Sequence, residues 1–233
     1  MKTIGILGGM GPQATMDFEN KLHLAAQNLI PQKANEGYPK IITYYFRQPP
    51  FKADGKGKAV EPLEPNPELL KAAAELGSLC DFLAIPSNTA HLFQNEIEQA
   101  SGKRVLSIVE AAFNEVSKRA VKKVGILGMG LTTKHQLYQT KLEGLGLDWL
   151  TIEQDMSGLL DKFVFDYMEG KITQEGHDLA VNCLEFIRKQ GAEAIIIASD
   201  EVLLLLGNKY AEAKDVINPA ELLAETAIQF AIK

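Results

Sequence analysis

The chain repeats one stretch of its sequence, Lys2-Thr3-Ile4-Gly5-Ile6-Leu7-Gly8, as Lys122-Lys123-Val124-Gly125-Ile126-Leu127-Gly128. A second pair follows at a similar distance: Asp81 to Ser87 in the first half is matched by Glu193 to Ser199 in the second. Each stretch has the short apolar run of a buried strand. Two paired elements in the same order predict two related lobes. Chance repetition between strands rich in valine and isoleucine is the alternative.

The rest of the chain alternates short β-branched runs with longer amphipathic segments, which is typical of βαβ units. Strands are predicted over 3–7, 41–46, 82–86, 104–108, 123–127, 148–152, 194–198 and 215–217. Helices are predicted over 12–29, 67–76, 89–99, 109–119, 132–145, 159–168, 173–189 and 219–231. The predicted fold class is α/β, with two pseudo-symmetric lobes, each a parallel sheet flanked by helices.

Length and composition fit this organisation. The 233 residues suffice for two compact lobes, predicted over 1–115 plus 209–233 and over 116–208. A net charge of -6 argues against a nucleic-acid partner, and the lack of a long apolar run argues against a membrane partner. Two cysteines, Cys80 and Cys183, fit a reducing compartment, and no export signal follows Met1. A cytoplasmic location is expected.

The ends of the predicted strands carry polar residues. Ser87 and Ser199 occupy matching ends of the repeated strands, and ligands gather beyond the carboxyl ends of parallel strands. If the lobes face each other about a pseudo-twofold axis, the two serines approach one ligand in the cleft from opposite sides.

Three motifs resemble the aspartate/glutamate racemase family. Gly8-Gly9-Met10-Gly11-Pro12 with Ala14-Thr15 is similar to the opening of aspartate racemases. Ser87-Asn88-Thr89-Ala90-His91 is similar to the Cys-Asn-Thr-Ala-His motif in every position but the first. Ala198-Ser199-Asp200-Glu201 retains only the glutamate of the Gly-Cys-Thr-Glu motif. The similarity extends to the closing helix at Asn218-Pro219-Ala220. Both catalytic cysteine positions therefore hold serine.

The resemblance implies racemisation without pyridoxal phosphate, and no other cofactor is expected. The histidines lie in separate predicted helices without metal-ligand spacing, so no metal site is expected either. One group removes the Cα proton of an amino acid and the other returns a proton from the opposite face, so that Ser87 and Ser199 take the catalytic positions. The substrate-binding residues implied are Met10, Arg47, Asn88, Thr89, Thr132, Thr133 and Glu201. Arg47 would bind a side-chain carboxylate and Glu201 would lie near the substrate ammonium. The implied partners are an amino acid or dicarboxylate and a second copy in a homodimer.

Serine needs a neighbouring base to do this chemistry, because an alcohol does not ionise as a thiol does. Asp200 and His91 are candidates for that base. Asp200 is alternatively a cap for the helix that Glu201 begins, and His91 is alternatively a packing or hydrogen-bonding residue. Loss of both thiols also fits a non-catalytic or reprogrammed homologue that binds a small carboxylate. An engineered inactivation is an alternative explanation for Ser87. At Ser199 the neighbouring positions 198 and 200 also depart from the family motif, which indicates natural divergence.

Other features have competing interpretations. The stretch from Gly9 to Ala14 fits a dinucleotide-binding motif, but the acidic residue expected about 20 positions later would fall in the polar loop 31–37. Lys52, Lys56 and Lys58 lie in a loop that is either a lid for an anionic substrate or a solvated connector.

Overall fold

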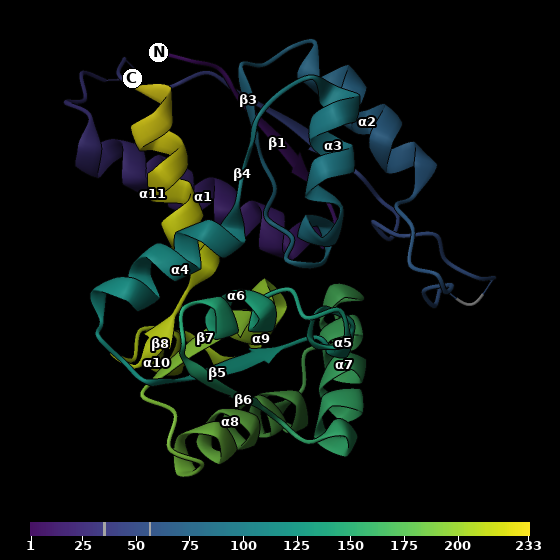
Figure 1. Cartoon of the computed structure of the whole chain (residues 1–233). Coiled ribbons are helices and arrows are strands. Elements are labelled where there is room, and N and C mark those ends of the chain that lie inside the picture. Colours follow the sequence, from purple (N-terminus) through teal and green to yellow (C-terminus); the bar gives the residue numbers. More distant parts are fainter. Residues whose placement is uncertain (35, 56) are drawn as a thin grey trace. The chain divides into compact units, whose positions relative to one another are not determined.

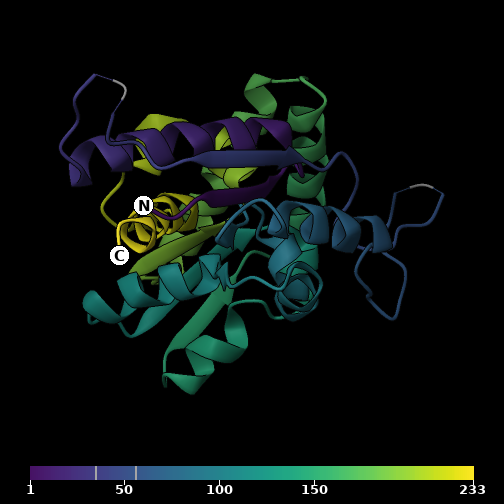
Figure 2. The same cartoon turned by 90° about the horizontal axis from the view of Figure 1, so that it is seen from above.

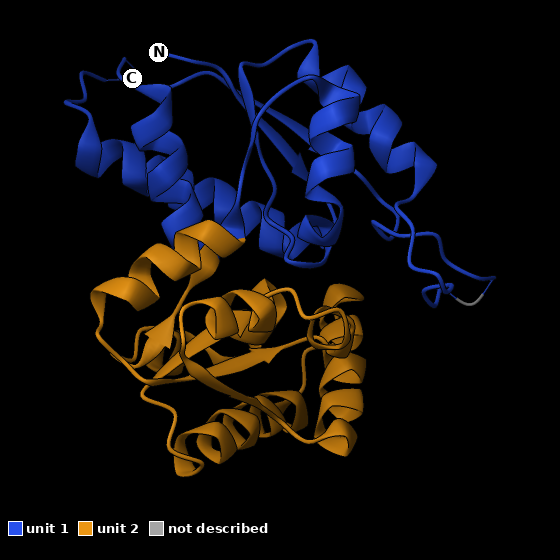
Figure 3. Cartoon of the chain, in the orientation of Figure 1, with its two compact units in different colours: residues 1–108, 220–233 blue, residues 109–219 orange. Residues whose placement is uncertain are grey.

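The computed structural model describes residues 1–34, 36–55 and 57–233, and these form two compact units (Figure 3). Unit 1 contains residues 1–108 and 220–233, and unit 2 contains residues 109–219. Both chain ends belong to unit 1, where the Lys2 amide donates to the Ala231 carbonyl at 2.8 Å (Figure 1). The C-terminal helix therefore returns to the unit in which the chain starts.

Each unit is built on a four-stranded parallel sheet. The strands are β1 (Ile4–Gly8), β2 (Ile41–Tyr45), β3 (Phe82–Ala84), β4 (Val105–Leu106), β5 (Lys123–Gly128), β6 (Asp148–Thr151), β7 (Ala194–Ala198) and β8 (Val216–Ile217). The strand orders are β2-β1-β3-β4 in unit 1 and β6-β5-β7-β8 in unit 2. The second order reproduces the first with every strand four places later. The predicted α/β class and the predicted internal repeat are thereby confirmed.

Helices flank both sheets. They are α1 (Pro12–Leu29), α2 (Pro67–Gly77), η1 (Thr89–Phe93), α3 (Gln94–Ser101), α4 (Ile108–Lys118), α5 (Gly130–Lys134), α6 (Gln139–Gly144), α7 (Gln154–Met168), α8 (Gln174–Lys189), α9 (Asp200–Leu206), α10 (Asn208–Ala211) and α11 (Pro219–Ala231). Within the described ranges, none is long and apolar enough to cross a bilayer.

Side chains alternate along the strands of unit 1 between the two faces of its sheet. Leu7, Leu83 and Ile85 face a core formed with α2 and α3. Phe82 points to the opposite face, where its ring meets Phe230 of α11 edge-on at 4.8 Å. On that side α1 runs alongside β2 (Figure 2), to which its side chains are hydrogen-bonded. In unit 2 the residues of β5 and β7 pack in the same way against α7, α8 and α9.

The unit boundaries differ from the division predicted from the sequence. They lie at 108/109 and 219/220 rather than at 115/116 and 208/209. The second difference arises because β8 pairs with β7, which keeps the chain in unit 2 up to Pro219. The first arises because α4 packs on unit 2, where Phe113 lies 6.2 Å from the ring of Tyr138.

Three of the predicted helices were wrong in extent. The segment 132–145 is two helices, α5 and α6, because Gln136 takes a left-handed conformation with φ 52° and the Gln139 side chain bonds the backbone at Thr133 and Tyr138. The segment 89–99 begins with the 3-10 helix η1 before α3. Helix α7 begins at Gln154 instead of residue 159, and α10 was not predicted.

Lys52 and Lys58 belong to an irregular arm of unit 1 between the Phe51 and Pro65 bridge partners. Lys52 forms an ion pair with Glu64 in the same arm. Lys56 lies outside the described residues. The lid role of this arm stays a prediction.

Candidate active site

The predicted site residues form two groups, one at the carboxyl edge of each sheet. Cluster 1, in unit 1, consists of Met10, Arg47, Ser87, Asn88 and Thr89. Cluster 2, in unit 2, consists of Thr132, Thr133, Ser199, Asp200 and Glu201. Strand order reverses at β1 in the first sheet and at β5 in the second. Such a reversal is where open α/β sheets bind ligands, and Ser87 and Ser199 follow the strands next to these points.

The turn after β1 brings the backbone of cluster 1 together. Gly9 has φ 89°, and a Cβ there would lie 2.6 Å from the backbone nitrogen of Phe46. The Gly9 amide donates to the Thr15 hydroxyl at 2.8 Å, and that hydroxyl donates to the Gly11 carbonyl at 3.0 Å. Close packing against the end of β2 thus accounts for the Gly9 requirement without a bound dinucleotide. Met10 is half-buried against the α2 side of the core.

Ser87 and Asn88 are buried at the end of the β3 segment, with 8% and 4% of their surfaces exposed, and Thr89 is half-buried. The Ser87 hydroxyl accepts a long hydrogen bond of 3.4 Å from the Ala90 amide in the first turn of η1. Cluster 1 therefore presents a nearly enclosed serine that is followed by two polar residues.

His91 is held by the backbone. Its Nδ1 lies 2.8 Å from the Ser87 carbonyl, and its Nε2 lies 3.1 Å from the Ile108 amide. Because an amide N–H only donates, Nε2 carries no proton and Nδ1 donates. Burial lowers the pKa of His91, which the bond to the Ser87 carbonyl partly opposes. His91 is thus a neutral hydrogen-bonding residue of the fold rather than a base that faces the Ser87 hydroxyl.

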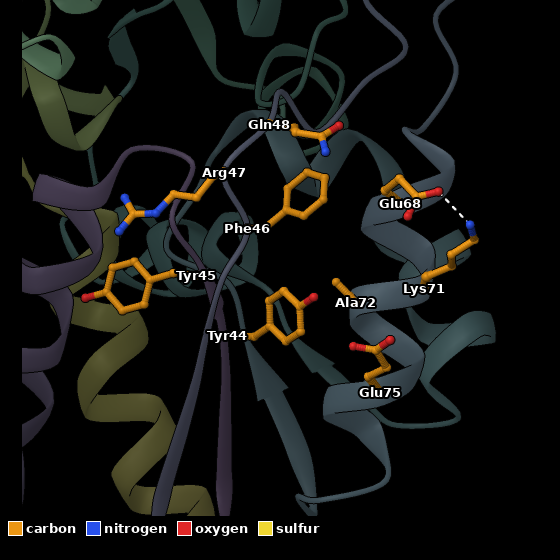
Figure 4. Close-up of a pocket in the computed structure, with 9 residues that line it drawn as sticks. All are labelled: Tyr44, Tyr45, Phe46, Arg47, Gln48, Glu68, Lys71, Ala72 and Glu75. Atoms are coloured by element: carbon orange, nitrogen blue, oxygen red, sulfur yellow. Dashed lines mark hydrogen bonds and ion pairs between the residues drawn. The ribbon is translucent and has the colours of Figure 1, made fainter.

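Arg47 is exposed just beyond the end of β2, and its guanidinium carbon lies 4.8 Å from the centre of the Tyr45 ring. Figure 4 shows these two side chains on one side of the strand, whereas Tyr44 and Phe46 point toward α2. A hollow on the α2 side is lined by Tyr44, Tyr45, Phe46, Arg47, Gln48, Glu68, Lys71, Ala72 and Glu75. Glu68 and Lys71 form an ion pair there at 2.6 Å. Ser87 is not part of its lining.

Ser199, Asp200 and Glu201 are buried at the start of α9, with 4%, 3% and 5% exposure. The Ser199 hydroxyl donates to Glu201 Oε2 at 3.0 Å. Helix α9 begins at Asp200, and Ser199 is its N-cap residue. The predicted capping alternative for Asp200 was therefore wrong in position: this residue is in the first turn, where a carboxylate complements the helix dipole.

The turn after β5 is closed by Asp161, a residue that the sequence did not single out. The Gly130 amide donates to both carboxylate oxygens of Asp161 in α7, at 3.0 and 3.3 Å. Burial raises the pKa of Asp161, and the bond from Gly130 opposes that shift. The Thr132 hydroxyl donates to the Met129 carbonyl at 2.7 Å, while Thr133 is half-buried.

Tyr138 was also missed, since it lies in the linker between α5 and α6 where no pattern marks it. It is 1% exposed, and burial raises its pKa well above 10.0, with the charge of Asp200 adding to the effect. The Tyr138 phenol therefore stays protonated, and the Asp200 carboxylate is near enough for its charge to act on that phenol.

Neither cysteine takes the place of the missing thiols. Cys80 is 6% and Cys183 is 0% exposed, each within the core of its unit. Burial raises the pKa of both thiols, that of Cys183 to about 11. In the part of the chain that the structure describes, no three His, Cys, Asp or Glu side chains are grouped to hold a metal ion.

The sequence matches a family model described as Asp/Glu/Hydantoin racemase over residues 7–227. The chain belongs to this racemase family. A similar protein is the broad specificity amino-acid racemase RacX of Bacillus subtilis, 35% identical over 144 residues. That match spans 61% of this chain and only 61% of the length of RacX.

Solved structures of the racemase family share the fold. An aspartate racemase from Picrophilus torridus matches with a TM-score of 0.81 and 22% identity, over 100% of this chain and 95% of that one. A protein from Yersinia pestis described as an Asp/Glu racemase matches with a TM-score of 0.76 and 20% identity, over 100% of both chains. An aspartate racemase homologue from Pyrococcus horikoshii gives 0.73 and 23%, again over 100% of both.

Proposed function

We propose that this chain is a cofactor-independent amino-acid racemase that acts on aspartate, glutamate or a related amino acid, with Ser87 and Ser199 on opposite faces of the substrate Cα. Membership of the racemase family supports the reaction class. The observation that carries the proposal is the buried hydrogen bond of 3.0 Å from the Ser199 hydroxyl to Glu201, because it supplies the base that a serine at this position needs.

In the proposed step the Ser199 oxygen receives the Cα proton as the Ser199 proton passes to Glu201. The products are a carbanion, an intact Ser199 hydroxyl and a protonated Glu201; the reverse transfer returns a proton to the same face. Preorganised donors must stabilise the carbanion. Asp200, which is equally buried at the start of α9, is the second candidate for the base.

Protonation from the other face would use the Ser87 hydroxyl. This hydroxyl accepts from the Ala90 amide, and His91 uses both ring nitrogens on backbone groups. The two faces are therefore unequal in base strength. We expect exchange of the Cα proton with retention, through Ser199, to be faster than inversion.

The substrate would be fixed by its charged groups. Arg47 would grip a side-chain carboxylate in a bidentate pair, and Asn88, Thr89, Thr132 and Thr133 would bind the α-carboxylate. Met10 would cover the substrate, and Glu201 would also face the ammonium group. Such a protein fits a role in amino-acid metabolism, as a cytoplasmic homodimer.

A second candidate function is binding of an amino acid or small dicarboxylate without turnover. The two serines favour it. So does His91, because both of its ring nitrogens are bonded to backbone groups and it therefore provides no base for the Ser87 face. Cluster 1 would then act as a carboxylate-binding site for sensing or for assembly with a partner.

Proton exchange separates the two functions. The wild-type protein is incubated in deuterated water with each enantiomer of aspartate, glutamate and alanine, and the Cα-proton signal is followed by NMR. Loss of that signal supports the racemase. Binding of an acidic amino acid with no loss supports the second function, and the Ser199→Ala variant serves as the control for exchange catalysed elsewhere.

A further inference from the structure

Arg47 is supported on the face of one neighbouring ring. Its guanidinium lies over Tyr45 at 4.8 Å, two residues back on the same side of β2 (Figure 4). A cation over an aromatic face is attracted by the ring quadrupole. Because Arg47 is otherwise exposed, this contact restricts a side chain that has several freely rotating bonds.

The Tyr45 ring is itself held from α1. Its phenol donates to Glu19 Oε2 at 3.1 Å, and the other Glu19 oxygen accepts from the Thr43 hydroxyl at 2.6 Å. Both oxygens of Glu19 are thus tied to β2, two residues apart on one face of the strand. Partial burial and Glu19 raise the pKa of Tyr45, so that the phenol remains a donor.

We infer, on the basis of the proposed function, that Tyr45 and Glu19 are positioning residues that set the specificity for a second carboxylate. Glu19 fixes the ring, the ring fixes the guanidinium, and a preorganised guanidinium loses less freedom when a side-chain carboxylate binds. A substrate without that carboxylate gains nothing from the arrangement.

The neighbouring residue provides a matched control. Tyr44 has the same side chain on the same strand but points toward α2, on the opposite side from Arg47 (Figure 4). Tyr44→Leu and Tyr45→Leu therefore remove equal side chains from the same edge strand, and only the second removes the support of Arg47. Tyr45→Phe keeps the ring and removes the bond to Glu19.

The experiment measures the dissociation constants of L-aspartate and L-alanine by calorimetry. Tyr45→Leu should weaken aspartate binding by about five- to ten-fold and leave alanine binding within about two-fold of the wild type. Glu19→Gln should also weaken aspartate binding selectively, but by a smaller factor. Tyr45→Phe should be intermediate, and Tyr44→Leu should resemble the wild type. Equal loss for both ligands, or equal loss in Tyr44→Leu, would overturn the inference.

A second measurement is independent of substrate. The Arg47 Nε–H resonance should lie upfield in the wild type and in Tyr45→Phe, because of the ring current, and should move downfield in Tyr45→Leu. An unchanged resonance in Tyr45→Leu would overturn the positioning even if aspartate binds. If the resonance moves as expected but the wild type neither binds aspartate nor exchanges its Cα proton, the proposed function fails and the support of Arg47 by Tyr45 stands.

Discussion

Replacing Glu201 by Gln removes one charge from the pair that carries the proposed chemistry. Glutamine has nearly the same volume as glutamate, and its carbonyl oxygen still accepts from the Ser199 hydroxyl at the observed 3.0 Å separation. The side chain is 5% exposed, so solvent does not replace the lost carboxylate. The variant thus changes the ability to take a proton while it preserves packing.

The expected loss follows from two terms. A hydrogen bond to a charged group contributes about 1.5–3 kcal/mol and one to a neutral group about half as much or less, so weakening the bond alone costs up to about ten-fold in rate. Removing a general base costs about 100- to 10,000-fold. If Glu201 accepts the proton, Glu201→Gln should lower the rate of Cα-proton exchange at saturating substrate by at least about 100-fold.

The assay compares Glu201→Gln with Asp200→Asn, which removes an equally buried charge one residue away. Exchange is followed in deuterated water at saturating aspartate, and thermal unfolding checks the fold. Asp200→Asn should retain exchange within about ten-fold. Glu201 is not the base if Asp200→Asn abolishes exchange while Glu201→Gln does not. Glu201 is also not the base if Glu201→Gln only raises KM, since it would then serve the substrate ammonium alone.

Three further outcomes are expected. Burial lowers the pKa of His91 below 6.5, so the unfolded chain binds the proton more readily than the folded one. The free energy of unfolding should therefore decrease as the pH drops below 6.5, by up to about 1.4 kcal/mol per pH unit. Urea unfolding at several pH values should show this dependence in the wild type and not in His91→Gln. Gly9→Ala should destabilise the folded protein by roughly 3 kcal/mol, because position 9 has φ 89° and the new Cβ would meet backbone atoms. Gly146→Ala should cost only roughly 1 kcal/mol, because position 146 has φ 70° but the new Cβ would meet open space. Thermal unfolding of the two variants checks this difference. Restoring both thiols, Ser87→Cys with Ser199→Cys, should raise racemisation of aspartate by about ten-fold or more, as seen by polarimetry, and no gain would show that the rest of the site has lost competence.

Much of the fold was predictable because short local sequence patterns determine many of its strands and helices. The strand over 194–198 and the helices over 12–29 and 219–231 agree with the structure residue for residue, since β-branched runs and an early proline mark their limits. The break between α5 and α6 was not predictable, because it depends on side-chain hydrogen bonds of Gln139 that leave no periodic signal.

The site followed the same rule. Residues at strand ends, such as Ser87 and Ser199, were accessible from the internal repeat and from the family motifs. Residues that act across elements were not: Asp161 reaches the Gly130 amide from α7, and Glu19 reaches Tyr45 from α1. Their spacing of 31 and 26 positions has no meaning in a single sequence, and only the fold brings them together.

A crystal structure with bound D- or L-aspartate measures the central arrangement most directly. We predict one amino acid with its Cα roughly 3–3.5 Å from the Ser87 oxygen on one side and from the Ser199 oxygen on the other, with its side-chain carboxylate on Arg47. An aspartate held by residues of one unit alone, with the second serine oxygen turned away from Cα, would contradict it.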